Sequence, residues 1–243
     1  AKKILNSKGI KTKLIFTKSY RSFYKSYFLN KKFLLPYVVA KIAISKDYLT
    51  INKKKKWITS VSSRKIAHLL RSRHDCIIST SKSINFDDSL LNCRINGLNK
   101  DKPDLFIIDL NLKLKKKLSL NYLIKNRKTY LITSKDNSKK VLAFKKIGYK
   151  IIFINNLKSK NDFYYMYKKI YKMGYARILI EAGLTFLNSL LRNKSINELY
   201  IFKSKKKLGK NGKNNVSSQY LKKIYPKLLT INLGDDKLYK KVF

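Results

Sequence analysis

Residues 177–192 read RILIEAGLTFLNSLLR, and this stretch decides the class of fold. A short apolar run, typical of a buried strand, precedes a segment with apolar side chains at helical spacing. Gly183 lies where the strand turns into the helix, and the free amides and dipole of a helix N-terminus favour a phosphate there. A single glycine at such a turn is more often structural, since the longer glycine signature of nucleotide-binding loops is absent.

The same alternation of strand and helix extends along the chain. Apolar runs predict mostly buried strands at 37–44, 75–79, 105–109, 129–133, 150–154, 177–180 and 198–202. Helical patterns lie between several of them, most clearly over residues 62–73, where apolar side chains recur at helical spacing. This order predicts an α/β domain with a mostly parallel sheet. Two strand-like runs flank Gly234-Asp235 and predict an antiparallel hairpin at its edge.

Three polar helical stretches end at glycines. Gly9, Gly148 and Gly174 each follow such a stretch, and an apolar run comes after each of them. Glycine is favoured just past a helix because the left-handed backbone conformation carries no steric cost for it. Within residues 1–35 the sequence pattern predicts a helix, a strand after Gly9 and a second helix. This segment can belong to a preceding domain.

The charge of the chain is the most unusual feature of its composition. Its 243 residues include 57 Lys and Arg against 13 Asp and Glu, a formal net charge of +44. Such a surplus is typical of proteins with a polyanionic partner. The lysines are spread along the whole length, however, which favours the compositional bias of an AT-rich genome over selection for an anionic ligand. A nucleic-acid partner is therefore not expected.

The cysteines and the apolar segments indicate the compartment. Cys76 and Cys93 have neither the spacing of a metal site nor the number that a disulfide framework needs. The longest apolar stretch, residues 33–44, is interrupted by a proline and a lysine and is too short to cross a membrane. We expect a cytoplasmic protein with no bound metal and no membrane segment.

Charged side chains form a second group of candidate site residues. Arg71, Arg73 and Arg94 can bind a phosphate through paired hydrogen bonds, while Asp87 or Asp88, in a predicted loop, can orient a hydroxyl group or a ring nitrogen. Surface ion pairs are the alternative interpretation of these five residues. Trp57 can stack on a cofactor ring or fill the core.

Seven short motifs occur in the order seen in one family, the reductase half of the bifunctional pyrimidine deaminase-reductase of riboflavin biosynthesis. They are Pro36–Val39 with Lys41–Ala43 and Ser45, Trp57–Thr59, Leu70–Asp75, Asp87-Asp88 with Arg94, Ile180–Gly183, Asn197–Tyr200 and Leu208-Gly209. The closing Leu233–Asp236 resembles the last hairpin of that family. Each motif is modest, but together they span residues 36–209, and the chain resembles this reductase domain.

The resemblance implies a dihydrofolate-reductase-like α/β fold, with a mixed, mostly parallel sheet flanked by helices and a C-terminal antiparallel hairpin. It implies that residues 36–243 form an NADPH-dependent reductase domain. It also implies that the protein is a homodimer. The reaction implied is reduction of the ribosyl group of 5-amino-6-(5-phosphoribosylamino)uracil to ribityl, with NADPH as hydride donor. The phosphates of substrate and cofactor also make a basic site expected without nucleic acid.

The resemblance also assigns site residues. Substrate contacts fall on Lys55, Arg71, Leu91, Arg94 and Glu181. Cofactor contacts fall on Ala43, Trp57, Ser83, Asp87, Gly183, Leu184, Thr185, Phe186, Leu187, Asn188 and Ser189. No residue stands out as a proton donor, so the catalytic work expected of the protein is positioning and charge complementarity.

Several positions depart from the pattern of the family. Tyr48, Thr80 and Lys82 stand where glycines are common, and Ser89 replaces a proline. Lys55 falls where the family often has a substrate-binding serine. These changes alter how closely the backbone can approach a cofactor, and a weakened enzyme would follow.

Residues 1–35 resemble the connecting end of a deaminase domain, and we expect a fragment of a multifunctional enzyme. The chain contains no zinc-deaminase motif, so deamination is not assigned to it. Two alternatives to the reductase stay open. One is a cationic nucleic-acid-binding protein on a degenerate reductase scaffold, and the other is a related enzyme that acts on another pyrimidine or a pterin.

Overall fold

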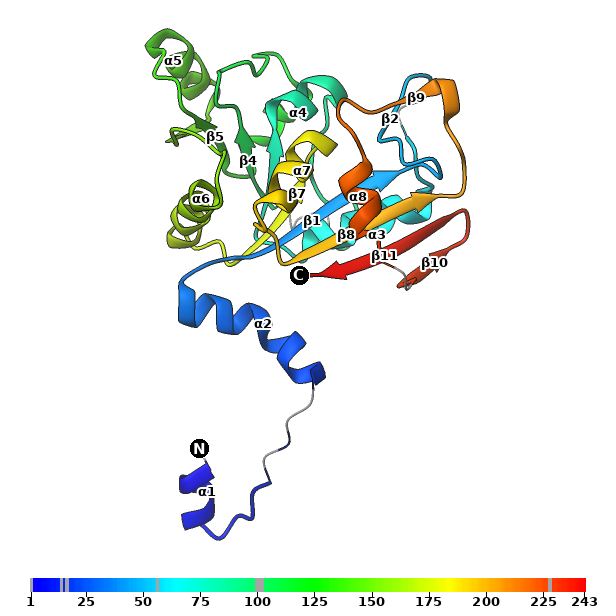
Figure 1. Ribbon diagram of the computed structural model, residues 1–243. Helices are drawn as coiled ribbons and strands as arrows, with labels where there is room; N and C mark the ends of the chain where they lie inside the picture. The colour runs from blue at the N-terminus through cyan, green and yellow to red at the C-terminus, as the bar shows by residue number, and fades with distance from the viewer. Residues whose placement is uncertain (1, 14, 16–17, 56, 99–102, 227–228) are drawn as a thin grey trace.

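The computed structural model describes residues 2–13, 15, 18–55, 57–98, 103–226 and 229–243 (Figure 1). Nine strands of these described residues form one mixed sheet in the order β10-β11-β8-β1-β7-β3-β4-β5-β6. The strands are β1 (Tyr37–Ile44), β3 (Cys76–Thr80), β4 (Asp104–Ile108), β5 (Thr129–Thr133), β6 (Lys150–Phe153), β7 (Arg177–Glu181), β8 (Glu198–Ser204), β10 (Ile231–Leu233) and β11 (Asp236–Val242). Two short strands, β2 (Ile51–Asn52) and β9 (Gly212–Lys213), pair separately.

All neighbours from β8 to β6 run parallel, whereas β11 and β10 run antiparallel at the edge. The expected mixed, mostly parallel sheet with a C-terminal hairpin is therefore confirmed. The hairpin turns at Gly234, whose φ of +74° suits glycine at the first position of a two-residue turn. All seven strands predicted before the hairpin occur, with ends that differ by up to two residues.

Helices cover both faces of the sheet and account for its apolar strands. On one face lie α6 (Lys160–Lys172), α7 (Leu184–Arg192) and α8 (Gln219–Ile224). On the other lie α3 (Val61–Ser72), α4 (Ser81–Asp87), the 3-10 helix η1 (Ser119–Leu123) and α5 (Ser138–Ile147). Alternate residues of β1 serve the two layers, with Val38 and Ala40 in one core cluster and Tyr37 and Val39 in the other. A strand buried on both faces reads as a continuous apolar run.

Helix α1 (Lys2–Ser7) lies away from this domain, whereas helix α2 (Lys18–Phe33) leads into β1 and contacts the domain, with the hydroxyl of Tyr171 donating to the carbonyl of Asn30 at 3.3 Å (Figure 1). None of the described residues 10–13 and 15 lies in a strand, and residues 14, 16 and 17 of the strand predicted after Gly9 lie outside the described residues. The described apolar side chains there, Ile10 and Ile15, are exposed. The helix ends at Gly148 and Gly174 are confirmed, with φ of +109° and +97°.

None of the helices in the described part of the chain is long and apolar enough to cross a bilayer.

Candidate functional site

The predicted site residues gather where the parallel strands β8, β1, β7 and β3 end. Loops and helices that follow these strands meet at this carboxyl edge of the sheet, which is where open α/β sheets bind their ligands. Three groups of side chains are found there: an ion-pair cluster around Glu181, a contact between α4 and α7, and a basic hollow.

Glu181 is the last residue of β7, and its carboxylate is held by two cations. Arg71 of α3 donates from Nε to Oε1 at 2.6 Å and from a terminal nitrogen to Oε2 at 3.0 Å. Lys41 lies beside Glu181 in the register of β1 with β7, and its Nζ is 3.5 Å from Oε2. The predicted substrate residues Arg71 and Glu181 are thus each other's partners.

The electrostatics of this cluster keep Glu181 ionised. The Glu181 residue is 8% exposed, and burial alone would raise its pKa. The charges of Arg71 and Lys41 outweigh that effect and lower the pKa of Glu181 to about 2. The same carboxylate raises the pKa of Arg71 against the opposing effect of burial. At neutral pH the cluster therefore holds one negative and two positive charges.

Helix α4 begins directly after β3 and runs to Asp87, so the loop predicted for Asp87 and Asp88 begins at Asp88. The Thr80 side chain accepts the Ser83 N–H at 3.3 Å and caps the helix, which runs to Asp87. Asp88 is the C-cap in the left-handed conformation, and its carboxylate accepts hydrogen bonds from the N–H and hydroxyl of Ser119. Asp88 therefore has a structural role, while Asp87 is exposed at the end of the helix.

The segment of residues 88–94, called the arginine loop below, carries two predicted substrate residues. Leu91 is buried among apolar side chains with φ of +48°, so it can offer only main-chain groups to a ligand. Arg94 is exposed, and its N–H donates to Nδ1 of His68 at 3.1 Å. Burial and the charges of Arg71 and Arg94 lower the pKa of His68 to about 4, so this ring is neutral at pH 7.

Helix α7 and helix α4 meet at their first turns. The N–H of Gly183 donates to Oγ of Ser83 at 3.1 Å, so two predicted cofactor residues are in contact. Gly183 is the N-cap of α7, and no side chain caps this helix. Thr185 is exposed, Phe186 and Ser189 are half-buried, and Leu184, Leu187 and Asn188 are buried. Leu187 packs in the core, and Asn188 donates to the carbonyl of Ser217. An anion at this helix would therefore meet the main chain of its first turn.

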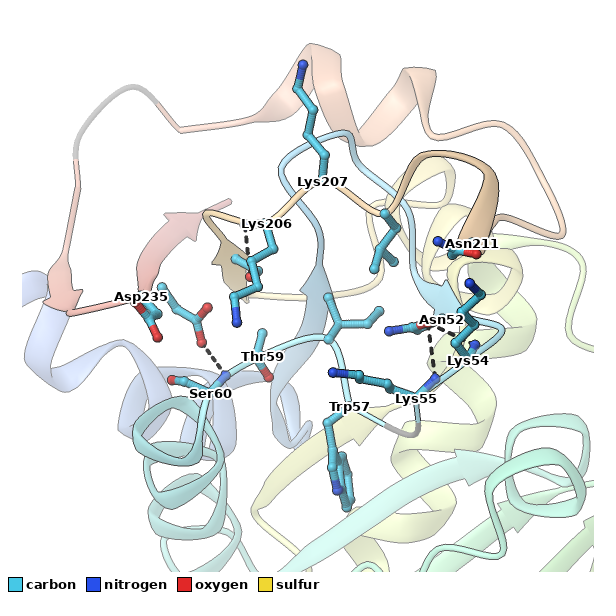
Figure 2. A pocket seen from close by; sticks show the side chains of 14 residues that line it. Asn52, Lys54, Lys55, Trp57, Thr59, Ser60, Lys206, Lys207, Asn211 and Asp235 are labelled. Atoms are coloured by element: carbon cyan, nitrogen blue, oxygen red, sulfur yellow. Dashed lines mark hydrogen bonds between the residues drawn. The ribbon is translucent and has the colours of Figure 1, made fainter.

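The loops after β1 and β8 enclose a hollow of about 300 Å³ (Figure 2). Its lining comprises Asn52, Lys54, Lys55, Trp57, Ile58, Thr59, Ser60, Ser204, Lys206, Lys207, Leu208, Asn211, Asp235 and Asp236. We call it the lysine hollow. Lys55 and Lys206 reach into it from facing walls, whereas Lys207 points away (Figure 2). Trp57 is 49% exposed beneath the guanidinium of Arg64, 4.9 Å from the ring centre.

The structure brings only some of the predicted residues together. Lys55 and Trp57 line the lysine hollow, and none of the other predicted site residues does. Ala43 lies on β1, opposite Phe202 of β8. Sequence reasoning did not select Lys41 or Lys206 as site residues. A lysine within the apolar run of β1 was a usable signal for Lys41, whereas Lys206 is one of three consecutive lysines in a lysine-rich chain.

Tyr48 occupies a position where a glycine-like backbone is needed. Its φ is +63°, in the left-handed region that a tyrosine rarely adopts. The ring compensates by packing edge-on against Tyr225, and Nζ of Lys203 lies 4.0 Å from its centre. The loop after β1 therefore keeps its turn despite the missing glycine.

Known proteins match most of this chain. The family model "RibD C-terminal domain" matches residues 36–238. The riboflavin biosynthesis protein RibD of Buchnera aphidicola is 32% identical over 200 aligned residues, and the match covers 76% of this chain and 52% of that protein. The RibD of Aquifex aeolicus is 26% identical over 176 residues, 72% of this chain and 48% of that protein. The chain thus spans about half the length of the curated relatives it matches.

Solved structures share the fold at lower identity. A structure of Acinetobacter baumannii RibD has a TM-score of 0.74 and 19% identity, and the match covers 99% of this chain and 67% of that one. The riboflavin biosynthesis reductase Rib7 of Saccharomyces cerevisiae has a TM-score of 0.66 and 17% identity, with 92% and 98% covered. Both likenesses concern the arrangement of the sheet and its helices.

Proposed function

Because this chain belongs to the RibD C-terminal domain family, we propose that it is the NADPH-dependent reductase that converts the ribosyl group of 5-amino-6-(5-phosphoribosylamino)uracil to ribityl. One observation of the geometry supports this proposal above the others. Two features suited to anions, the uncapped N-terminus of α7 and the lysine hollow, lie at the same edge of the sheet. Such a pair suits an enzyme that brings two phosphorylated molecules together.

The first turn of α7 fits a dinucleotide phosphate. Gly183 has no side chain to cover the helix amides, and the hydroxyl of Ser83 lies beside it. In this proposal Gly183 and Thr185 hold the cofactor phosphates, while Ala43, Trp57 and Asp87 contact its other parts. When bound, NADPH supplies the hydride, and the residues around it fix its position and exclude water.

The substrate side of the proposal uses the remaining charges. Lys55 and Lys206 would bind the phosphate of the substrate in the lysine hollow. Arg94, which is exposed on the arginine loop, would supply a further contact to the substrate. Glu181 stays ionised between Lys41 and Arg71, so it would accept hydrogen bonds from N–H groups of the pyrimidine. These substrate-binding residues would contribute to the rate by orienting the sugar of the substrate toward the hydride donor.

The direct test follows NADPH oxidation by the purified protein with the deaminated pyrimidine substrate. Turnover that requires this substrate supports the proposal, and absence of both NADPH binding and turnover overturns it. Dihydropterins and other pyrimidines serve as comparison substrates, and preference for one of them would favour the related enzyme. Steeply salt-dependent binding of RNA, without NADPH binding, would favour the nucleic-acid alternative.

The proposal also covers the N-terminal segment, the oligomeric state and the compartment. We propose that residues 1–35 connect the reductase domain to a deaminase domain, because the family match begins at residue 36 and Tyr27 and Phe28 of α2 are exposed.

We also propose a homodimer in the cytoplasm, where Cys76 and Cys93 would stay reduced, as both are free here. Sedimentation analysis of the 243-residue chain tests the dimer.

A further inference from the structure

Arg127 lies between η1 and β5 and is buried without a carboxylate partner among the described residues. The residue is 6% exposed. Its two terminal nitrogens donate to the carbonyls of Leu91 and Leu90, each at 2.6 Å. Its Nε has no acceptor within the described structure. The two terminal nitrogens of the guanidinium are therefore both directed at consecutive carbonyls of the arginine loop.

A buried cation in this setting is costly for the fold. Burial, followed by the positive charge of Arg71, lowers the pKa of Arg127 to about 10, so the group is still charged at pH 7. An apolar side chain of similar size would avoid the loss of hydration. What an apolar residue cannot do is hold two neighbouring carbonyl groups in one orientation.

The loop that Arg127 holds is under local strain. Leu91 has φ of +48°, in the left-handed region that is unfavourable for a residue with a side chain. Such a backbone persists only where the surrounding contacts fix it. Arg71 supplies a further contact by donating to the carbonyl of Asn92 at 3.0 Å, and His68 accepts the N–H of Arg94. Four residues of the loop, Leu90, Leu91, Asn92 and Arg94, are thus fixed by three side chains from outside it.

We propose that Arg127 is a positioning residue, which holds the arginine loop in the strained form that presents Arg94 and the main chain of Leu91 to the substrate. The identity of the substrate in this inference rests on the proposed function. The claim that Arg127 holds the arginine loop rests only on its contacts with Leu90 and Leu91. Arg127 itself touches neither substrate nor cofactor in this role. It acts through the carbonyls of Leu90 and Leu91, and its loss should affect the substrate side of the site more than the cofactor side.

The test compares Arg127→Met, which fills the space without hydrogen bonds, with Arg127→Lys, which can restore one of them. Hydrogen exchange by mass spectrometry reports on residues 88–98, and steady-state kinetics report KM for the substrate beside the dissociation constant for NADPH. We expect Arg127→Met to speed exchange in that segment alone and to raise KM about tenfold or more, with NADPH affinity unchanged within about twofold. Arg127→Lys should recover part of both effects.

A matched control is Tyr149→Phe, which removes a hydrogen bond to Asn121 close to Arg127 without touching the loop. It should leave KM and the exchange of residues 88–98 as in the unaltered chain. Faster exchange throughout the domain in Arg127→Met, or an unchanged KM, would overturn the proposal. If Arg127→Met does not fold, Arg127→Lys decides on the same criteria. If the unaltered chain shows no turnover, the proposed function fails, and the exchange measurement still decides whether Arg127 holds the loop.

Discussion

The guanidinium of Arg71 and the carboxylate of Glu181 form a paired hydrogen bond, at 2.6 Å and 3.0 Å, between residues 110 positions apart in the chain. Arg71 belongs to α3 on one face of the sheet, and Glu181 ends β7 within it. Both side chains are largely buried, with 12% and 7% of their surfaces exposed. The pair therefore joins a surface helix to the centre of the candidate site.

Replacement of Arg71 by methionine should destabilise the domain strongly. Removing one partner leaves the carboxylate of Glu181 buried with only Lys41 nearby, and such losses cost about 3–5 kcal/mol. Urea unfolding at pH 7 measures this difference. The double variant Arg71→Met/Glu181→Gln should regain much of the loss, because no buried carboxylate then remains unpaired and the side chain of Lys41 is 20% exposed. Additive effects of the two changes would show that the pair is not coupled.

The same pair should make the domain sensitive to acid. The pKa of Glu181 falls from its ordinary value of 4.5 to about 2 in the folded chain. A lowered folded-state pKa contributes stability that is complete above pH 4.5 and is lost as the pH falls toward 2; a shift of this size corresponds to about 3 kcal/mol. Unfolding free energies measured between pH 6 and pH 3 should fall less steeply in Glu181→Gln than in the unaltered chain. Equal slopes would contradict the assignment.

Most of the sheet was predictable from the sequence because a strand buried on both faces needs a continuous apolar run. The run of β1, from Tyr37 to Ile44, shows this directly. The strand after Gly9 was predicted by the same rule, but none of the described residues 10–13 and 15 lies in a strand, since a run of apolar residues does not say whether a partner strand is present. Likewise, Asp87 ends α4 instead of lying in the predicted loop, because Thr80 caps a helix directly after β3.

Only those site residues that lie in recognisable sequence motifs could be predicted. Glu181 and Gly183 follow a strand, and their place at its carboxyl end follows from that alone. The pairing of Glu181 with Arg71 depends on how α3 packs, and nothing in the sequence around either residue specifies it. The clamp of Arg127 on Leu90 and Leu91 is a long-range contact of the same kind.

Asp236 should be important for stability although it lies in the closing hairpin. Its Oδ2 accepts the N–H of Ser60 at 2.6 Å and the hydroxyl of Ser63 at 2.5 Å, at the N-terminus of α3. Asp236→Ala would leave both donors unpaired and remove a negative charge from the helix N-terminus, at a cost of about 2 kcal/mol. Thermal and urea unfolding measure it. Asp235→Ala, at the exposed neighbouring residue, is the control and should change stability by under about 0.5 kcal/mol.

Gly148 and Gly174 separate the effect of backbone conformation from that of a steric clash. Both have positive φ after a helix, at +109° and +97°. A Cβ on Gly148 would lie 2.7 Å from Cγ2 of Ile124, whereas a Cβ on Gly174 would meet nothing within 4 Å. Gly174→Ala should therefore cost about 1 kcal/mol for its backbone alone, and Gly148→Ala clearly more. Equal losses in urea unfolding would mean that Ile124 moves aside freely.

Lys206 and Lys207 are neighbours in the sequence that point in different directions, and this makes them a matched pair for the lysine hollow. Lys206 reaches into the hollow from the wall facing Lys55, while Lys207 points away (Figure 2). Each change to methionine removes the same charge, so any general effect of the net charge on an anionic substrate is shared by the two variants. If the hollow binds the substrate phosphate, Lys206→Met should raise KM about tenfold, the loss of one charge-assisted hydrogen bond, and leave kcat nearly unchanged. Lys207→Met should change KM by less than about twofold. Steady-state kinetics at constant ionic strength make the comparison, and equal effects of the two variants would mean that the phosphate is bound elsewhere on the edge of the sheet.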